Sequence, residues 1–291
     1  MTYFLLLLVF TSAIIHASWN LMVRARGANQ MLLRVPLLIT IIGLLPALWL
    51  EWTTQPFSPF VWAMLIITSI FQSFYYLGLL RGYEYGDFTM VYPIVRALPV
   101  LFIAIFDTLR GNQPHPAAWL GMVLVSMGCL VIPHTSFRNL QLGVYRNRVM
   151  GWVLLAAIGT VGYSVVDKLA AEQMAPGAIT AARYYVYESA FTFLMLWATL
   201  RFQGLPTGLE KLRSDWPWST VAAIGVFSSY WLILWAYQIS IQASTIVAMR
   251  QISIVIGAVA GSLLFREPAR HLRITAAAMI TLGVILIAVT K

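Results

Sequence analysis

The sequence predicts an all-α integral membrane protein with ten transmembrane helices, arranged as two inverted five-helix repeats. Of its 291 residues, 60% are hydrophobic and only 10% are charged, whereas a soluble domain carries about 25% charged residues. Apolar runs of the roughly 20 residues needed to cross a bilayer core recur along the whole chain. Short segments rich in Gly, Pro and Asn separate these runs and are typical of turns.

Ten stretches have the length and composition of a membrane span. They cover residues 3–23, 31–50, 60–80, 88–108, 116–133, 150–170, 178–200, 217–237, 243–264 and 272–290. Buried helices of a large soluble protein would need polar outer faces, which these segments lack. We interpret the first run as a retained helix rather than a signal peptide, because no basic residue precedes it and it continues to Val23.

The net charge of +9 does not indicate a nucleic-acid-binding protein. The Lys and Arg residues lie between the apolar runs rather than on one polar stretch. The single cysteine, Cys129, lies inside an apolar run, so neither a disulfide framework nor metal-ligand spacing is present. We therefore expect no metal, no cofactor and no nucleic-acid partner.

The basic residues at the span ends predict an orientation. Twelve of them lie on one side of the predicted membrane, and only Arg110, Lys168 and Lys291 lie on the other. Because positive loops stay in the cytoplasm, we expect loops 1–2, 3–4, 5–6, 7–8 and 9–10 to be cytoplasmic. Both termini then face away from the cytoplasm.

Five spans precede the basic loop near residue 140 and five follow it, so any structural repeat must be inverted. We divide the chain into a first repeat (1–137), a connecting loop (138–149) and a second repeat (150–291). Sliding the chain by 154 residues places Arg96 on Arg250 and Tyr83 on Tyr237 without a gap. A binding site is expected near the midplane, where the halves meet.

Ionisable residues inside the spans mark candidate sites, because each costs about 2.5–3.5 kcal/mol at mid-helix on insertion scales. Arg96 and Arg250 lie near the middles of the fourth and ninth spans. Polar or aromatic residues share a helix face with a titratable group at i,i+4 spacing. These pairs are His16 with Asn20, Tyr92 with Arg96, Tyr163 with Asp167, and Tyr184 with Glu188.

Two interpretations of these residues stay open. Arg96 either pairs with Asp167 or Glu188 in a fixed ion pair, or it binds substrate. Asp167 and Lys168 lie near a helix end, where interfacial water can solvate them. Asp107 lies near another end, so we expect it to be wet and leave it out of the site.

The chain resembles the drug/metabolite transporter superfamily, in its EamA-type ten-helix branch. The resemblance spans essentially the whole chain. It is carried by HASWN (16–20), RGYEYGD (81–87), VYPIVR (91–96), YSVVD (163–167), LWA (234–236), the segment around Arg250, and LFREP (264–268). The first half departs from the pattern at Gln113, where an acid is usual.

The resemblance implies an inverted five-plus-five fold with helices 4 and 9 at the cavity, and alternating access. Such transporters move amino acids, other metabolites or drugs, often outward. Matching residue by residue implies cavity roles for Trp19, Asn20, Tyr92, Arg96, Asp167 and Arg250. Gln251 stands where one branch of the family prefers Glu, so proton coupling through this position does not carry over.

We therefore predict a secondary transporter of a small metabolite, with an amino acid or related zwitterion favoured and outward movement expected. The substrate-binding candidates are His16, Trp19, Asn20, Tyr92, Arg96, Tyr163, Asp167, Tyr184, Glu188, Arg250 and Gln251. The expected location is a plasma membrane of the bacterial inner-membrane type. The expected partners are the lipid bilayer, the substrate and protons as a coupling ion, in a monomer or homodimer.

Three alternatives follow from the same sequence. The first is an exporter of apolar, drug-like compounds, in which acids and arginines neutralise each other. The second is an intramembrane enzyme. The sequence argues against it, because it has no Gly-x-Ser-x-Gly motif and because His115, His134 and His271 lie at loops. The third is a channel, although no charge ring or carbonyl filter repeats in the chain. No phosphate-binding loop for ATP is present either.

Overall fold

The computed structural model describes residues 2–26, 33–85, 88–131, 148–205, 207, 209, 216–256 and 270–290. Every long regular element in these residues is an α-helix. The helices are α1 (Tyr3–Arg26), α2 (Arg34–Thr53), α3 (Pro59–Tyr85), α4 (Phe88–Leu109), α5 (Pro116–Val131), α6 (Arg148–Ala171), α7 (Ala178–Phe202), α8 (Trp216–Ile239), α9 (Ala243–Arg250) and α11 (Arg270–Val289). Each of the ten predicted spans contains one of them, which confirms the predicted fold class.

Five of the described helices are long and apolar enough to cross a membrane by length and composition alone: α1, α2, α3, α6 and α8. The apolar helical segments that the structure describes in α5, α9 and α11 are shorter. Beyond Arg250 the chain turns at Gln251 and continues as a helix to residue 256. Residues 257–264, the rest of the predicted ninth span, lie outside the described part.

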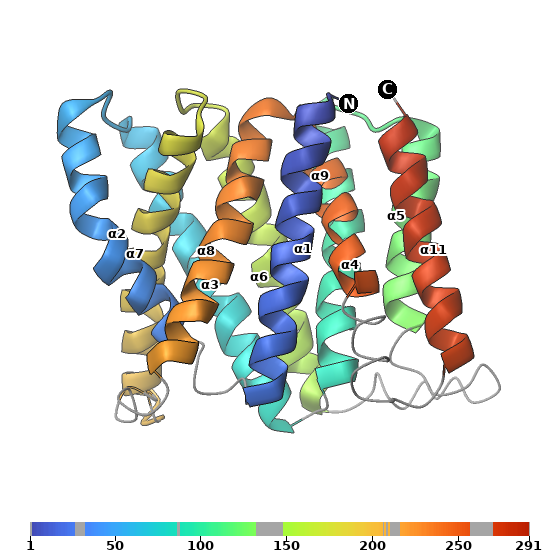
Figure 1. Ribbon diagram of the computed structural model, residues 1–291, viewed down its shortest axis with the longest axis horizontal. Helices are drawn as coiled ribbons and strands as arrows, with labels where there is room; N and C mark the ends of the chain where they lie inside the picture. Colours follow the sequence, from blue (N-terminus) through green and yellow to red (C-terminus); the bar gives the residue numbers. More distant parts are fainter. Residues whose placement is uncertain are drawn as a thin grey trace.

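The helices stand side by side and alternate in direction (Figure 1). α1 begins and α11 ends at the same end of the bundle, which we call the termini end. Helices from the two halves of the chain pack against each other: α3 along α6, α1 along α8, α2 along α7, and α5 along α11. The connection between α8 and α9 also lies at the termini end.

The bundle is apolar outside and contains polar groups inside, as expected for a protein surrounded by lipid. On α2 the side chains of Ile41, Ile42, Leu45 and Trp49 are exposed. In contrast, Arg96, Asp167, Glu188 and Arg250 are all buried, as are several serines and threonines. A soluble protein shows the opposite distribution, so the chain is a multi-pass membrane protein.

Glycine allows two of the helix pairs to approach closely. A Cβ atom on Gly159 of α6 would lie only 2.5 Å from the backbone nitrogen of Tyr75 on α3. Likewise, a Cβ on Gly121 of α5 would lie 2.6 Å from the carbonyl oxygen of Gly283 on α11. Inside a membrane the lipid tails are as apolar as the helix surface, so the hydrophobic effect does not drive helices together. Small residues at such crossings therefore help by letting the helices approach closely and pack tightly.

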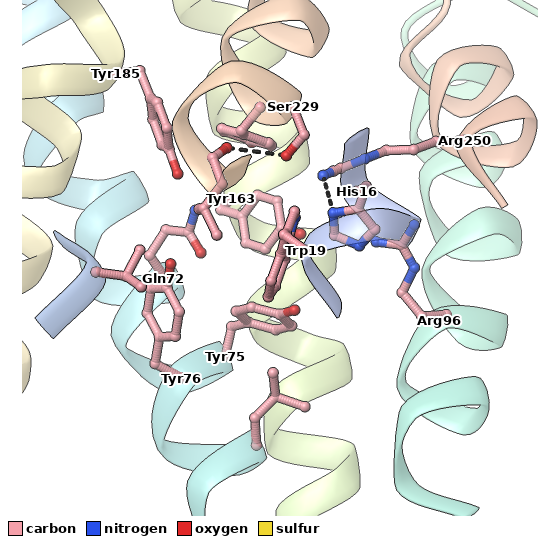
Figure 2. Close-up of a pocket in the computed structure, with 14 residues that line it drawn as sticks. His16, Trp19, Gln72, Tyr75, Tyr76, Arg96, Tyr163, Tyr185, Ser229 and Arg250 are labelled. Carbon is pink, nitrogen blue, oxygen red and sulfur yellow. Dashed lines mark hydrogen bonds between the residues drawn. The ribbon is translucent and has the colours of Figure 1, made fainter. Parts of the chain in front are cut away.

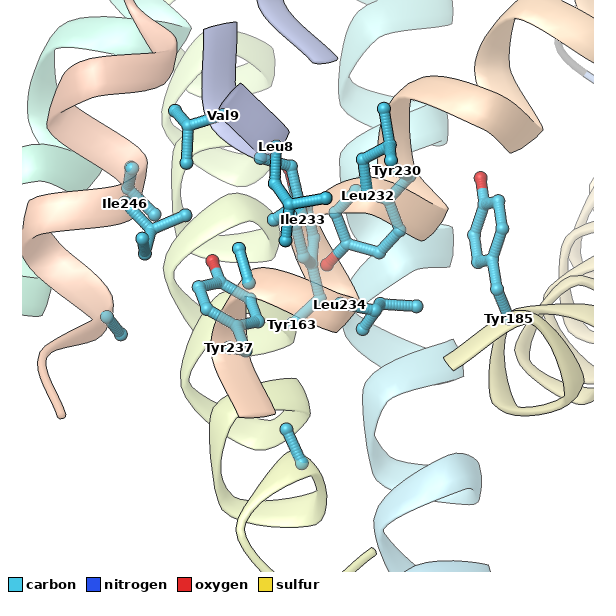
Figure 3. Close-up of a cluster of buried hydrophobic side chains, with 14 of the residues drawn as sticks. Leu8, Val9, Tyr163, Tyr185, Tyr230, Leu232, Ile233, Leu234, Tyr237 and Ile246 are labelled. Carbon is cyan, nitrogen blue, oxygen red and sulfur yellow. The ribbon is translucent and has the colours of Figure 1, made fainter. Parts of the chain in front are cut away.

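The main apolar core runs through the bundle, and one part of it lies where α1, α6, α8 and α9 meet. Leu8 and Val9 of α1, Ile233 of α8 and Ile246 of α9 are almost completely buried there. Figure 3 shows that tyrosines of α6, α7 and α8 join this cluster. Helices from both halves of the chain thus contribute to this part of the core, and it lies beside the polar residues at the centre of the bundle.

Candidate functional site

A cavity lies between the halves of the chain, next to this core (Figure 2). It has a volume of about 70 Å³, which holds several water molecules, since one water needs roughly 10–15 Å³. Side chains from α1, α2, α3, α4, α6, α7, α8 and α9 surround it. They are His16, Trp19, Val35, Gln72, Tyr75, Tyr76, Leu79, Arg96, Tyr163, Tyr185, Val226, Ser229, Tyr230 and Arg250.

Two arginines form a cationic side of the cavity. Arg96 of α4 and Arg250 of α9 both line it, as the 154-residue offset predicts, and both are buried. The Nη2 group of Arg250 lies 3.2 Å from Nδ1 of His16. Because an arginine can only donate, Nδ1 of His16 must accept, which fixes a neutral imidazole with its proton on Nε2.

Gln251 holds the other arginine in place. Nε of Arg96 donates to Oε1 of Gln251 over 2.9 Å, and Nε2 of Gln251 donates back to the carbonyl oxygen of Arg96 over 3.2 Å. This reciprocal pair ties α4 to the end of α9. Gln251 therefore belongs to the site through Arg96, although it does not line the cavity.

Aromatic rings form much of the rest of the wall. The guanidinium of Arg250 lies over the ring of Tyr230, 5.4 Å from its centroid. Tyr163 contacts the rings of Tyr75 and Tyr230 edge to face, with centroids 5.7 Å apart in each case. Trp19 contacts the ring of His16 in the same manner. Such faces bind cations and flat apolar groups.

The two buried acids, Asp167 and Glu188, do not line the cavity in the described structure. Asp167 accepts hydrogen bonds from the hydroxyls of Thr68 (2.7 Å), Tyr184 (3.0 Å) and Tyr230. Glu188 accepts one from the amide of Gln72 over 2.8 Å. Because Tyr230 and Gln72 line the cavity, each acid lies one side chain behind its wall.

The ion pair between Arg96 and a buried acid is not formed. Among the described residues, no basic nitrogen lies within 4.0 Å of the carboxylate of Asp167 or Glu188. Neutral hydroxyl and amide donors on α3, α7 and α8 occupy their oxygens instead. Tyr184 and Glu188 are both buried on α7, and the Tyr184 hydroxyl donates to Asp167 rather than to Glu188.

The expectation that Asp107, Asp167 and Lys168 are solvated at helix ends is wrong. All three side chains are at most 2% exposed. Asp107 accepts hydrogen bonds from the backbone nitrogen and hydroxyl of Ser244, at 2.8 and 2.6 Å, at the start of α9. The physical reason is that residues of α8 and α9 pack against these positions and cover them, which the chain's own hydropathy does not reveal.

The predicted site residues thus fall into three groups. His16, Trp19, Arg96, Tyr163 and Arg250 line the cavity. Gln251, Asp167, Tyr184 and Glu188 lie behind its wall. Asn20 donates to the carbonyl oxygen of His16 within its own helix over 2.7 Å, and the side chain of Tyr92 lies outside the described residues.

Sequence reasoning missed several wall residues: Gln72, Tyr75, Tyr76, Tyr185, Ser229 and Tyr230. The Gln72 amide inside an apolar span was a usable signal, because a polar group at that depth needs a partner. The tyrosines gave a weaker signal. Their type is common at membrane interfaces, and nothing in their spacing separates a cavity ring from an interfacial one.

An apolar helical bundle with polar side chains around a cavity between its helices is the architecture of a multi-pass membrane protein. The model of the EamA-like transporter family matches the chain twice, at residues 3–133 and 147–289. The chain therefore belongs to the EamA-like transporter family, which places it among the membrane transporters of the drug/metabolite transporter superfamily.

Solved structures support the fold. A crystal structure of a protein that is 15% identical in sequence matches with a TM-score of 0.65, covering 96% of this chain and 95% of that chain. At this identity the likeness concerns the fold alone. No curated protein matches the sequence.

Proposed function

We propose that the protein is a secondary transporter that exports a small zwitterion, such as an amino acid, by alternating access. The observation that carries the proposal is that Arg96 and Arg250 line one cavity, while none of its described lining residues is a carboxylate. Guanidinium groups bind carboxylates and related anions through paired hydrogen bonds. Two of them beside one small cavity favour a substrate with an anionic group.

The opposite side of the cavity suits an ammonium group. Tyr75, Tyr163 and Gln72 line it there, and Figure 2 shows their side chains across the cavity from the two arginines. Aromatic faces attract cations, especially where water is excluded. The buried acids behind Gln72 and Tyr230 add a negative field. They therefore favour the ammonium without contacting it, which revises the direct contact that the sequence suggested.

The cavity's size and position fit this substrate class. A volume of about 70 Å³ suits a molecule of a few heavy atoms better than a drug-sized ligand. Val35 at the start of α2 and Leu79 near the end of α3 extend the lining toward the end opposite the termini. If that end is cytoplasmic, the described state receives substrate from the cytoplasm, as an exporter requires.

The test measures uptake of a radiolabelled amino-acid mixture into proteoliposomes, with the variants Arg96→Ala and Arg250→Ala. We expect each variant to fold and to lose at least about tenfold in uptake, because each removes an anion-binding group worth roughly 1.5–3 kcal/mol. The matched control is Arg110→Ala, which removes an arginine that pairs with Glu172 outside the cavity. Normal uptake by both cavity variants would show that these arginines are structural.

The second candidate, an exporter of apolar drug-like compounds, is favoured by the aromatic lining. The same variants separate the two. Efflux of an aromatic dye that persists in both variants, together with no amino-acid uptake by the unmodified protein, would favour the drug exporter, whose ligands need no anion site. Saturable uptake that unlabelled amino acids inhibit would favour the zwitterion carrier and exclude a channel.

We further propose that both termini face away from the cytoplasm of a plasma membrane, of the bacterial inner-membrane type. The excess of Lys and Arg on the other side supports this orientation. An alkaline phosphatase fused after Lys291 should be active, since this enzyme folds only outside the cytoplasm. A C-terminal fluorescent fusion that is bright in the cytoplasm would contradict the orientation.

A further inference from the structure

The two buried acids, Asp167 and Glu188, accept hydrogen bonds from one face of α3. Thr68 donates to Asp167 and Gln72 donates to Glu188. These two donors are four residues apart on one helix face, roughly 6 Å along α3, and each acid contacts one of them. Asp167 comes from α6 and Glu188 from α7, and both are at most 1% exposed. Two carboxyl groups therefore lie close together inside the membrane.

The hydrogen bonds of the two acids differ. Asp167 accepts hydrogen bonds from three hydroxyl groups, two on Oδ1 and one on Oδ2, which suits an ionised carboxylate. Glu188 accepts one amide donor on Oε1, and within the described structure Oε2 is buried without a hydrogen-bond partner. A bare carboxylate oxygen in the membrane interior is costly, and more so beside a second negative charge. A proton on Oε2 removes that cost.

From this arrangement we propose that Asp167 and Glu188 form a proton-binding site that is coupled to substrate binding in the cavity. In the described state the pair holds one negative charge, on Asp167, and one proton, on Oε2 of Glu188. The side-chain amide of Gln72 can turn to accept that proton's hydrogen bond, because Oε1 of Gln72 is also buried without a partner in the described structure.

The groups that face the pair are mostly neutral. The phenols of Tyr76, Tyr163, Tyr184, Tyr185, Tyr230 and Tyr237 surround it from α3, α6, α7 and α8. Arg250, which lies over the ring of Tyr230 and beside neutral His16, and Arg96 are the cations that line the cavity. Lys168 follows Asp167 in the chain but directs its ammonium to the carbonyl oxygens of Tyr237 and Ser240.

Tyr230 and Gln72 connect the proton site to the cavity. The hydroxyl of Tyr230 bonds Asp167 while its ring lies under Arg250, and Gln72 bonds Glu188. Both side chains also line the cavity. A positive group that enters beside Gln72 therefore meets the field of the pair directly.

The coupling that follows is an exchange. When the ammonium of a substrate enters beside Gln72, it supplies the positive charge that the proton supplied before. The proton then leaves Oε2 of Glu188 for water, and the carboxylate left behind is balanced by the ammonium. Proton and substrate thus occupy the site alternately, which makes the carrier an antiporter. This step depends on the proposed function, whereas the proton site itself does not.

The proton site is tested on the purified protein without any substrate, by infrared difference spectroscopy across a pH titration. We expect a carbonyl stretch of a protonated carboxylic acid that persists at a pH where exposed carboxylates are ionised. Glu188→Gln should abolish this band and Glu172→Gln, which changes a more exposed acid, should keep it. Absence of the band in the unmodified protein, or its persistence in Glu188→Gln, would refute the site.

Coupling is tested in proteoliposomes with the radiolabelled amino-acid mixture as the probe. A proton gradient should drive uptake by the unmodified protein. In Glu188→Gln the ratio of gradient-driven uptake to exchange at equal pH should fall at least tenfold, because exchange needs no net proton movement. Should Glu188→Gln fail to fold, Asp167→Asn serves instead, because it removes the charge that holds the proton nearby.

The outcomes separate the two proposals. If the unmodified protein carries no amino acid but its infrared band depends on Glu188, the proton site stands and the proposed substrate is wrong. If amino acids are carried and Glu188→Gln or Asp167→Asn responds to the gradient as the unmodified protein does, the coupling is wrong and the transport function stands.

Discussion

The charged residues of the bundle form two groups that are built in opposite ways. At the termini end, Asp107, Arg110, Lys168 and Glu172 form a group that we call the end cluster. Glu172 pairs with Arg110 at 2.7 Å and with Lys168 at 3.1 Å. In the centre, the cavity arginines and the buried acids are kept apart, with the ring of Tyr230 between Arg250 and Asp167.

The end cluster satisfies its charges where the helices end. Lys168 donates to the carbonyl oxygens of Tyr237 and Ser240 at the end of α8, and Asp107 accepts from Ser244 at the start of α9. Each charge thus complements a helix end, where backbone groups lack intrahelical partners. The cluster ties α4, α6, α8 and α9 together, and we infer that its role is structural.

Among the described residues, the two cavity arginines and the carboxylates of Asp167 and Glu188 form no ion pair with one another. Evolution can place an arginine and a carboxylate in direct contact within this fold, as the end cluster shows. Under the proposed function, keeping them apart at the cavity preserves a positive field for an anion and a negative field for a proton or an ammonium. The contrast would then separate charges that hold the bundle together from charges that we propose bind substrate or protons.

The largest expected effect comes from breaking the end cluster at Lys168. Lys168→Met keeps the length of the side chain but removes the donor to the carbonyl oxygens of Tyr237 and Ser240, the second of which is only partly buried. A buried unsatisfied group costs about 1–3 kcal/mol and a partly buried one less, so we expect a loss of roughly 2–4 kcal/mol in unfolding free energy. Thermal or denaturant unfolding in detergent measures it, with Arg110→Met as a control of smaller effect. Unfolding like that of the unmodified protein would show that the cluster is not structural.

The next prediction makes the same chemical change in both groups. Asp107→Asn places amide hydrogens against the donors of Ser244 and should cost about 1–3 kcal/mol. Glu188→Gln replaces a carboxylic acid by its neutral isostere and should cost little. Parallel unfolding curves test this difference. Equal destabilisation by the two changes would remove the distinction between structural and binding charges.

The third prediction introduces an ion pair at the centre of the bundle, like those of the end cluster. Gln251→Glu places a carboxylate where Oε1 of Gln251 now accepts from Arg96. The new acid competes with an anionic substrate for this arginine. We expect the apparent affinity for amino acids to fall about tenfold, equivalent to about 1.4 kcal/mol. Competition binding in detergent measures it, and unchanged affinity would indicate that Arg96 does not contact the anion.

The sequence predicts the fold well because the bilayer sets the length of every span. It also identifies Arg96 and Arg250, since a charge in an apolar run stands out and the internal offset pairs the two residues. The division into two repeats at residues 137 and 150 stays a prediction of the sequence, and so does the oligomeric state.

The sequence does not predict which charges meet. Asp107 and Lys168 lie near helix ends in the chain, but neighbouring helices cover them in space. Tyr230, which joins both central groups, has no unusual sequence context. Contacts between helices depend on crossing angles and close approaches, such as the one at Gly159, and a single sequence contains these only implicitly.

The smallest effect concerns Glu172, which lies in the turn after α6. Partial burial alone would raise the pKa of Glu172, but hydrogen bonds and positive charge from Arg110 and Lys168 outweigh it and lower that pKa below its ordinary value. A carboxyl whose pKa is lower in the folded state stabilises the fold above its unfolded pKa, and this contribution is lost as the pH falls through the folded value. Because the Glu172 side chain is 29% exposed, the contribution should be no more than about 1 kcal/mol.

We therefore expect the unfolding temperature of the unmodified protein to fall slightly more on acidification than that of Glu172→Gln. Glu84→Gln is a suitable control, since Glu84 is more exposed and pairs with Arg81 at the other end of the bundle. If Glu172→Gln loses stability on acidification as steeply as the unmodified protein, the ion pairs of Glu172 add nothing to the end cluster, and its strength comes from the helix ends that Asp107 and Lys168 bind.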